Sequence, residues 1–172
     1  DLDSMGFAAD SFFGGFDHVL TGFERNFEVI RVQRWFPGES WATHRPPTML
    51  NALGKPWAQC NHMGHQDTLR RGLTMPHYSY VFPKQVWAKH LYYSHYSPGI
   101  TIADYPTKVF LPWVLGDDER KNEIERKWDG IHNFVPSYRG PCYSAPFSGE
   151  HPEQIRQSLS ELETRFDEEI EW

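Results

Sequence analysis

The sequence contains no apolar run of the roughly 18 residues that a helix needs to cross a bilayer, so no membrane span is expected. It also lacks a basic excess, because 17 Lys and Arg stand against 23 Asp and Glu, which gives a net charge of −6. A surface that binds phosphates of nucleic acid normally carries more positive than negative charge. Nucleic acid is therefore not an expected partner.

Cysteine is scarce as well. The two cysteines, Cys60 and Cys142, do not form a CxxC pair and are not spaced with histidines as zinc ligands are. Two cysteines can form one disulfide, and the sequence leaves that state open. Reduced thiols in a cytoplasmic protein are the simpler expectation.

Aromatic residues, in contrast, are abundant: 7 Trp, 8 Tyr and 12 Phe make up 16% of the chain. Such a content excludes a disordered or linker segment. Aromatic side chains suit a hydrophobic core and also a sugar-binding cleft, and filling a core is the simpler explanation for most of them. The 172 residues fit a single domain, 1–172, or a part of a larger protein.

Hydrophobic periodicity predicts both strands and helices. Residues 27–35 alternate and include β-branched residues, and 77–82 form a second short apolar run, so both segments are predicted to be strands of one sheet. Helices are predicted over 84–96, 117–128 and 151–172, and the last has apolar residues every three or four positions. The expected fold is α/β or α+β: a short mixed sheet with flanking helices and long loops.

Glycine and proline interrupt the remaining segments. Gly14 and Gly15 predict a bend within an apolar run. Residues 38–76 have no sustained period and are predicted to be an ordered, functional loop. Prolines are expected to break 100–115, and 129–147 is expected to be loop.

Histidines suggest two possible metal sites. In His65-Gln66-Asp67, strand spacing would place the imidazole and the carboxylate on one side, where His132 or His151 could complete an iron site. Three letters recur often by chance, and the flanking sequence does not have a strand pattern.

The second possible site is His77, which is followed by aromatic residues just before a predicted helix. A metal ion held mainly by diphosphate oxygens needs few protein ligands, so one histidine and one acid could serve. A structural, hydrogen-bonded histidine explains the same residues equally well.

Four segments in order resemble the distal half of bacterial family-two-like glycosyltransferases with the GT-A fold. They are residues 12–20 (FFGGFDHVL), 27–35 (FEVIRVQRW), 77–83 (HYSYVFP) and 147–152 (FSGEHP), and together they span nearly the whole chain. The resemblance implies an enzyme that transfers a sugar from a nucleotide-sugar donor to a carbohydrate acceptor, with manganese or magnesium bound together with the donor.

The same resemblance implies that the nucleotide-binding units and an Asp-x-Asp metal motif should precede residue 12 by several dozen residues. Only eleven residues stand there, and Asp1-Leu2-Asp3 lies too close to the resembling segments. The chain is therefore expected to be the acceptor-side portion of a larger glycosyltransferase, inactive alone. Where relatives tend to carry an acidic residue after the strand, this chain has Thr43–Pro47, so the catalytic base is not located by the resemblance.

Roles follow for the polar and aromatic residues of these segments. His77 is assigned to the metal or diphosphate, and Asp67 is the candidate catalytic base. Arginine pairs well with phosphate oxygens, and aromatic rings stack on sugars. The candidate substrate-binding residues are Arg34, Trp41, His44, Arg45, Tyr78 and Tyr80.

Two other functions remain open. The first is a non-heme iron, 2-oxoglutarate-type oxygenase that uses His65 and Asp67. The second is a non-catalytic, carbohydrate-binding remnant that keeps only the aromatic cleft. Bound metal would separate them, since iron is expected in the oxygenase, manganese or magnesium with nucleotide in the transferase, and none in the remnant.

Overall fold

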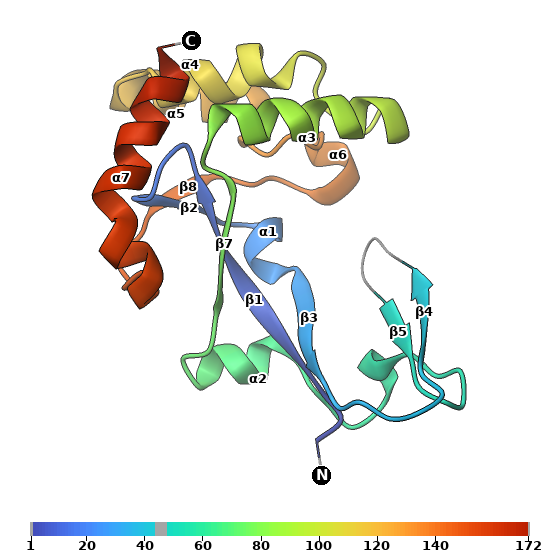
Figure 1. Ribbon diagram of the computed structural model, residues 1–172. Coiled ribbons are helices and arrows are strands. Elements are labelled where there is room, and N and C mark those ends of the chain that lie inside the picture. Colours follow the sequence, from blue (N-terminus) through green and yellow to red (C-terminus); the bar gives the residue numbers. More distant parts are fainter. Residues whose placement is uncertain (1, 44–47, 172) are drawn as a thin grey trace. The chain divides into compact units, whose positions relative to one another are not determined.

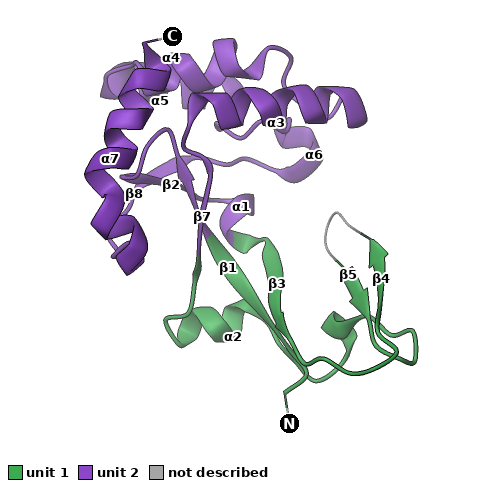
Figure 2. Ribbon diagram, in the orientation of Figure 1, with its two compact units in different colours: residues 1–9, 26–75 green, residues 10–25, 76–172 purple. Residues whose placement is uncertain are grey.

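The computed structural model describes residues 2–43 and 48–171, and the chain divides into two compact units (Figure 2). The first unit comprises Asp1–Ala9 and Asn26–Met75, and the second comprises Asp10–Arg25 and Pro76–Trp172. The chain therefore enters the second unit, returns to the first and enters the second again.

Helices and strands are mixed, which confirms the predicted α+β class (Figure 1). The strands that the structure describes are β1 (Ser4–Phe13), β2 (His18–Leu20), β3 (Glu28–Gln33), β4 (Ser40–Thr43), β5 (Thr48–Leu50), β6 (His62–Met63), β7 (Met75–Tyr80) and β8 (Ser144–Pro146). The helices are α1 (Phe23–Asn26), α2 (His65–Arg70), α3 (Pro83–Tyr96), α4 (Leu111–Val114), α5 (Asp118–Trp128), α6 (Pro136–Arg139) and α7 (Glu153–Ile170), with a 3₁₀ turn η1 (Trp57–Gln59) and a π-helix η2 (Pro106–Phe110).

Strand β1 organises the larger sheet, which has six strands in the described part of the chain. In the first unit, its Ser4–Ala8 segment pairs antiparallel with β3 and its first residues pair parallel with β6. In the second unit, Phe12 pairs with Val19 of β2, which in turn pairs with β8. Strand β7 also pairs with β1, so the prediction that 27–35 and 77–82 contribute strands to one sheet is confirmed.

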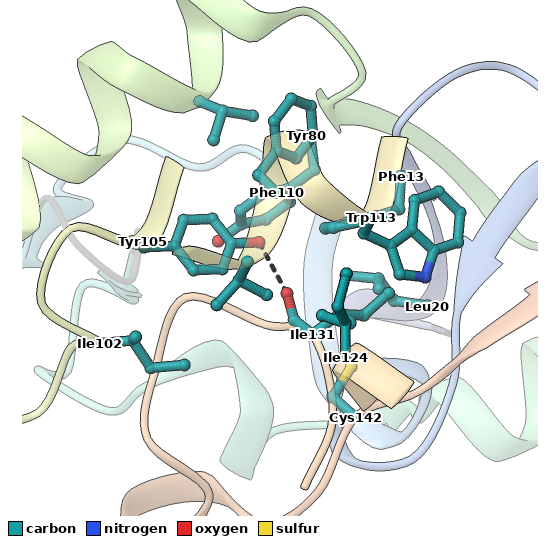
Figure 3. Close-up of a cluster of buried hydrophobic side chains, with 12 residues drawn as sticks. Phe13, Leu20, Tyr80, Ile102, Tyr105, Phe110, Trp113, Ile124, Ile131 and Cys142 are labelled. Atoms are coloured by element: carbon teal, nitrogen blue, oxygen red, sulfur yellow. Dashed lines mark hydrogen bonds between the residues drawn. The ribbon is translucent and has the colours of Figure 1, made fainter. Parts of the chain in front are cut away.

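The main hydrophobic core lies in the second unit (Figure 3). Phe13 of β1 meets Trp113 edge-on, with ring centroids 5.0 Å apart, and Val86 places α3 in the same cluster. Tyr105 is fully buried, and its hydroxyl donates to the Ile131 carbonyl oxygen at 2.6 Å. A buried tyrosine needs such an acceptor, because an unpaired hydroxyl would cost free energy.

The C-terminal helix α7 packs on a second cluster, formed by Phe12, Phe16, Val81 and Phe82. Its contacts are the predicted apolar positions Ile155, Leu159, Leu162 and Phe166. The 3.6-residue period of the sequence therefore identified both the helix and its buried face.

Three expectations about loops are wrong. Residues 129–147 contain the short elements α6 and β8. Residues 38–76 contain β4, β5, η1, β6 and α2, elements too short to produce a periodic pattern. Residues 106–114 are helical, because Pro106 and Pro112 each occupy the first positions of a helix, η2 and α4. A proline there loses no intrahelical hydrogen bond, since the first N–H groups of a helix have no partner within it.

Neither cysteine forms a disulfide: Cys60 and Cys142 are free thiols. Burial raises the pKa of Cys142 to about 12, and its Sγ–H donates to the Thr21 carbonyl oxygen at 3.0 Å. Across residues 2–43 and 48–171, no helix is both long enough and apolar enough to cross a bilayer.

Two glycines make the predicted bend after β1, with φ of 62° at Gly14 and 147° at Gly15. Gly130 is more tightly constrained. Its φ is 122°, and a Cβ there would lie 2.4 Å from the Cys142 carbonyl oxygen, which is backbone and cannot rotate away.

We expect Gly130→Ala to destabilise the protein by about 2–3 kcal/mol, because it adds backbone strain to a steric clash. Urea unfolding followed by circular dichroism measures this. Gly99→Ala is the matched control, since Gly99 has a φ of 86° with nothing within 4 Å of the added Cβ. Equal losses in the two variants would show that the close approach to Cys142 costs nothing.

Candidate functional site

A cluster of polar side chains in the second unit surrounds Glu24, the second residue of α1. The short helix follows Gly22, whose φ of 65° turns the chain after β2. The Glu24 side chain is only 13% exposed. A carboxylate is rarely buried without partners, so its surroundings define a possible site.

Ser11 links Glu24 to His77. The Ser11 hydroxyl donates to Glu24 Oε1 at 2.9 Å, and Ser11 Oγ lies 3.2 Å from His77 Nδ1. Because a hydroxyl has one proton, His77 must donate through Nδ1 when Ser11 donates to Glu24. The lone pair of the neutral His77 ring is then on Nε2, the nitrogen through which such a ring would bind a metal.

A second histidine, His132, lies near the other carboxylate oxygen of Glu24. His132 Nε2 lies 3.6 Å from Glu24 Oε2 and 3.2 Å from the Tyr80 hydroxyl. The Phe134 backbone N–H donates to His132 Nδ1 at 3.1 Å, so the ring proton of neutral His132 is on Nε2. Tyr80 in turn donates to Asn133 Oδ1.

Burial determines the charge states in this cluster. Desolvation raises the pKa of Glu24, although the Ser11 hydrogen bond and the positive charges of Lys89 and Arg139 oppose it. Desolvation also lowers the pKa of His132 well below its ordinary value, with Lys89 and Arg139 acting in the same direction. A carboxyl with a raised pKa beside a neutral imidazole, here that of His132, is an arrangement typical of acid–base catalysis.

Comparisons with models of protein families, with curated proteins and with solved structures found no match. The chemistry of the Glu24 cluster therefore has to be argued from its own geometry.

The donor set around His77 bears on whether a divalent metal fits. Within the described ranges, no group of three or more His, Cys, Asp or Glu side chains is arranged to hold a metal ion. His77 Nε2 with its lone pair can serve as one ligand, and a metal bound to a diphosphate needs few others from the protein. Among the described residues, the cluster therefore offers one imidazole toward a metal ion that is held mainly by another molecule.

Three sequence-predicted residues lie on β7, and their exposures differ. His77 is half-buried at Ser11. Tyr78 stacks on Phe12 with ring centroids 4.4 Å apart, and its hydroxyl lies 2.8 Å from His151 Nδ1, so one ring face is covered. Tyr80 is 2% exposed and Lys89 Nζ lies 3.7 Å from its ring centroid, which makes it a core residue with no open face for a sugar.

The other predicted site residues belong to the first unit. Trp41 on β4 is 63% exposed. Arg34 lies 4.0 Å from Asp3 in a weak ion pair, and Asp67 pairs with Arg70 at 3.3 Å on the exposed side of α2. His44 and Arg45 lie outside the described residues.

The strand spacing assumed for His65 and Asp67 is wrong, because both residues are in helix α2. Residues two apart on a helix do not share a face. His65 instead donates its backbone N–H and its Nδ1–H toward Glu28, at 2.6 Å and 3.0 Å. The iron site considered from this motif therefore loses its geometric basis.

Glu28 forms the second polar cluster of the protein, within the first unit. Besides the hydrogen bonds from His65, Glu28 accepts one from His62 Nε2 at 2.9 Å. His62 Nδ1 lies 2.7 Å from Ser4 Oγ. Burial alone would raise the pKa of Glu28, but the hydrogen bonds from His65 and His62 lower it overall. These partners favour the ionised form of Glu28, and the carboxylate links β3, β6 and the start of α2 to one another.

We expect Glu28→Gln to destabilise the first unit by about 1–3 kcal/mol, since a charged acceptor of three donors is lost. Because the pKa of Glu28 is lower in the folded state, its contribution is present above the unfolded pKa near 4.5 and is lost as pH falls through the folded value. The protection factor of the His65 amide against hydrogen exchange should fall in the variant, and in the natural protein under acid.

Asp67→Asn is the matched control, because the Asp67–Arg70 pair is exposed and worth at most about 0.5 kcal/mol. An unchanged His65 exchange rate in Glu28→Gln would show that this carboxylate does not stabilise the unit.

Proposed function

We propose that the chain carries the acceptor-side portion of a GT-A-type glycosyltransferase, and that Glu24 is its general base. The observation that supports this is the Glu24 cluster: a nearly buried carboxyl with a raised pKa, connected through Ser11 to His77, the histidine that the resemblance assigns to the metal or diphosphate. A base and a diphosphate-side histidine in one cluster are what sugar transfer needs.

The reaction breaks the bond between the anomeric carbon and the diphosphate and forms a bond from that carbon to an acceptor hydroxyl. The ionised Glu24 takes the hydroxyl proton while the acceptor oxygen attacks. A divalent ion bound with the donor would neutralise charge on the leaving diphosphate, and His77 would be the histidine on the side of the metal and the diphosphate.

The surroundings of Glu24 suit this role. The Ser11 hydroxyl donates a hydrogen bond to Oε1 of Glu24, and the neutral His132 ring lies beside Oε2. Because this ring is neutral, it adds no positive charge that would lower the basicity of the carboxylate. Burial raises the pKa of Glu24, and the positive charges of Lys89 and Arg139 oppose this rise, which favours the ionised form that a base requires.

Nucleotide release from a panel of nucleotide-sugars, with manganese and with simple sugar acceptors, tests the proposal on the full natural chain. Acceptor-dependent release is the expected result. Absence of release with every donor, while the protein is folded, would overturn it.

A further inference from the structure

Besides the Glu24 cluster, the second unit has a pocket that contains a partly buried ion pair. Arg25 donates through Nη1 to Asp10 Oδ1, and the two side chains are 32% and 13% exposed. Burial lowers the pKa of Arg25. Because desolvation of two charges offsets much of their attraction, stability alone is a weak reason for such a pair.

The pocket has a volume of about 330 Å³, and backbone and apolar side chains form much of its wall. Phe147 is held firmly there, since its N–H donates to the Asp17 carbonyl oxygen at 2.7 Å and its ring meets Phe12 edge-on at 4.7 Å. The lining residues are Asp10, Val19, Leu20, Thr21, Arg25, Pro146, Phe147, Ser148 and Gly149.

We propose that this Asp10–Arg25 pocket binds one neutral pyranose unit. A carboxylate offers about four acceptor positions and a guanidinium five N–H donors, so neighbouring hydroxyls can bond to the pair without separating it. The C–H faces of a sugar match the apolar surfaces of Phe147 and Val19.

Charge and size favour this ligand over others. The ion pair is neutral as a whole and the chain carries a net charge of −6, which disfavours an anion. The volume lies at the lower end of ligand pockets, about 300–1,000 Å³, and so suits one sugar ring rather than a nucleotide.

This pocket is separate from the Glu24 proposal. Ser11 and Asp10 are neighbours on β1, so their side chains point to opposite faces of the strand. Loss of transfer in a Glu24 variant therefore leaves sugar binding here unaffected, and the two proposals fail independently.

Saturation-transfer NMR with methyl glycosides of glucose, galactose, mannose and N-acetylglucosamine, and with their disaccharides, tests the inference. We expect signals from at least one neutral sugar, with an affinity that falls about tenfold or more in Asp10→Asn because a charged hydrogen bond is lost. Binding of methyl glycosides indicates that a single sugar suffices, whereas binding of disaccharides alone indicates the end of a longer chain.

Two further variants make the test decisive. Ser148→Tyr, at an exposed loop position, should fill the pocket and abolish the signals even if Asp10→Asn does not fold. Asp104→Asn removes a carboxylate from the exposed Asp104–Lys108 pair and should leave binding unchanged. The proposal would be overturned if no sugar gave a signal, or if inorganic phosphate bound in preference to sugars. It would also be overturned if folded Asp10→Asn and Ser148→Tyr bound sugar as well as the natural protein does.

Discussion

Glu24→Gln should reduce sugar transfer by about 10²–10⁴-fold, the usual contribution of a general base. Glutamine keeps the shape of the side chain and can still accept a hydrogen bond from Ser11, but it cannot take a proton from the acceptor. The effect should appear in kcat, measured by nucleotide release, because the lost interaction acts in the transition state.

Stability should respond differently from activity. The pKa of Glu24 is raised in the folded protein, so ionisation of this group opposes folding increasingly as pH rises through the folded value. Removing the charge should therefore leave the free energy of unfolding at pH 7 unchanged or slightly higher. In the natural protein, the transfer rate should rise with pH across the raised pKa of Glu24.

Glu125→Gln is the matched control for this experiment. Glu125 accepts hydrogen bonds from Trp113 Nε1 at 3.0 Å and from the Ser144 hydroxyl at 2.5 Å, so its carboxylate stabilises the fold. This variant should lose stability and keep its activity. Full activity in Glu24→Gln would show that another group takes the proton.

Trp113→Ala should destabilise the second unit by about 3–5 kcal/mol, the range for removing a large aromatic side chain from a core. Trp113 is 1% exposed and contacts Phe13, and Lys121 Nζ lies 4.7 Å from its ring centroid. The substitution also removes the donor to Glu125, which leaves a carboxylate oxygen with one partner fewer.

Urea unfolding followed by circular dichroism measures this loss. Leu91→Ala on α3 is the matched control, because Leu91 is 66% exposed and little buried area is removed. We expect that control to change the free energy of unfolding by less than about 1 kcal/mol. Similar losses in both variants would contradict the assignment of Trp113 to the central core.

Prediction from sequence succeeded where a local pattern persisted over several residues. The apolar positions of α7 and the turn-bounded strands β3 and β7 were recognisable because each element is long enough to repeat its period. Strand β1 was not predicted, although it is the longest strand in the described residues. Its sequence SMGFAADSFF includes Gly, Ala and Asp, which have low strand propensity, and pairing on both sides compensates for them.

The candidate site shows the same difference between local patterns and tertiary contacts. His77 was predicted as a site residue from its sequence context. Glu24 was not predicted, because a single glutamate on a four-residue helix has no distinguishing pattern. Its proximity to Ser11 and to His132 depends on chain segments that are separated in sequence. A buried acid beside a turn glycine was the only available signal, and burial itself cannot be derived from so short an element.

The sequence by itself determined that helices and strands are mixed, and it located the longer helices and strands β3 and β7, because propensity and periodicity are local properties. Only the tertiary structure decided in which direction the pKa of each of two acids, Glu24 and Glu28, is shifted. Glu28 receives three hydrogen bonds and has a lowered pKa, while Glu24 is desolvated and has a raised one. The difference arises from burial and from partners that folding brings together, and the residues that neighbour each acid in the sequence determine neither of them.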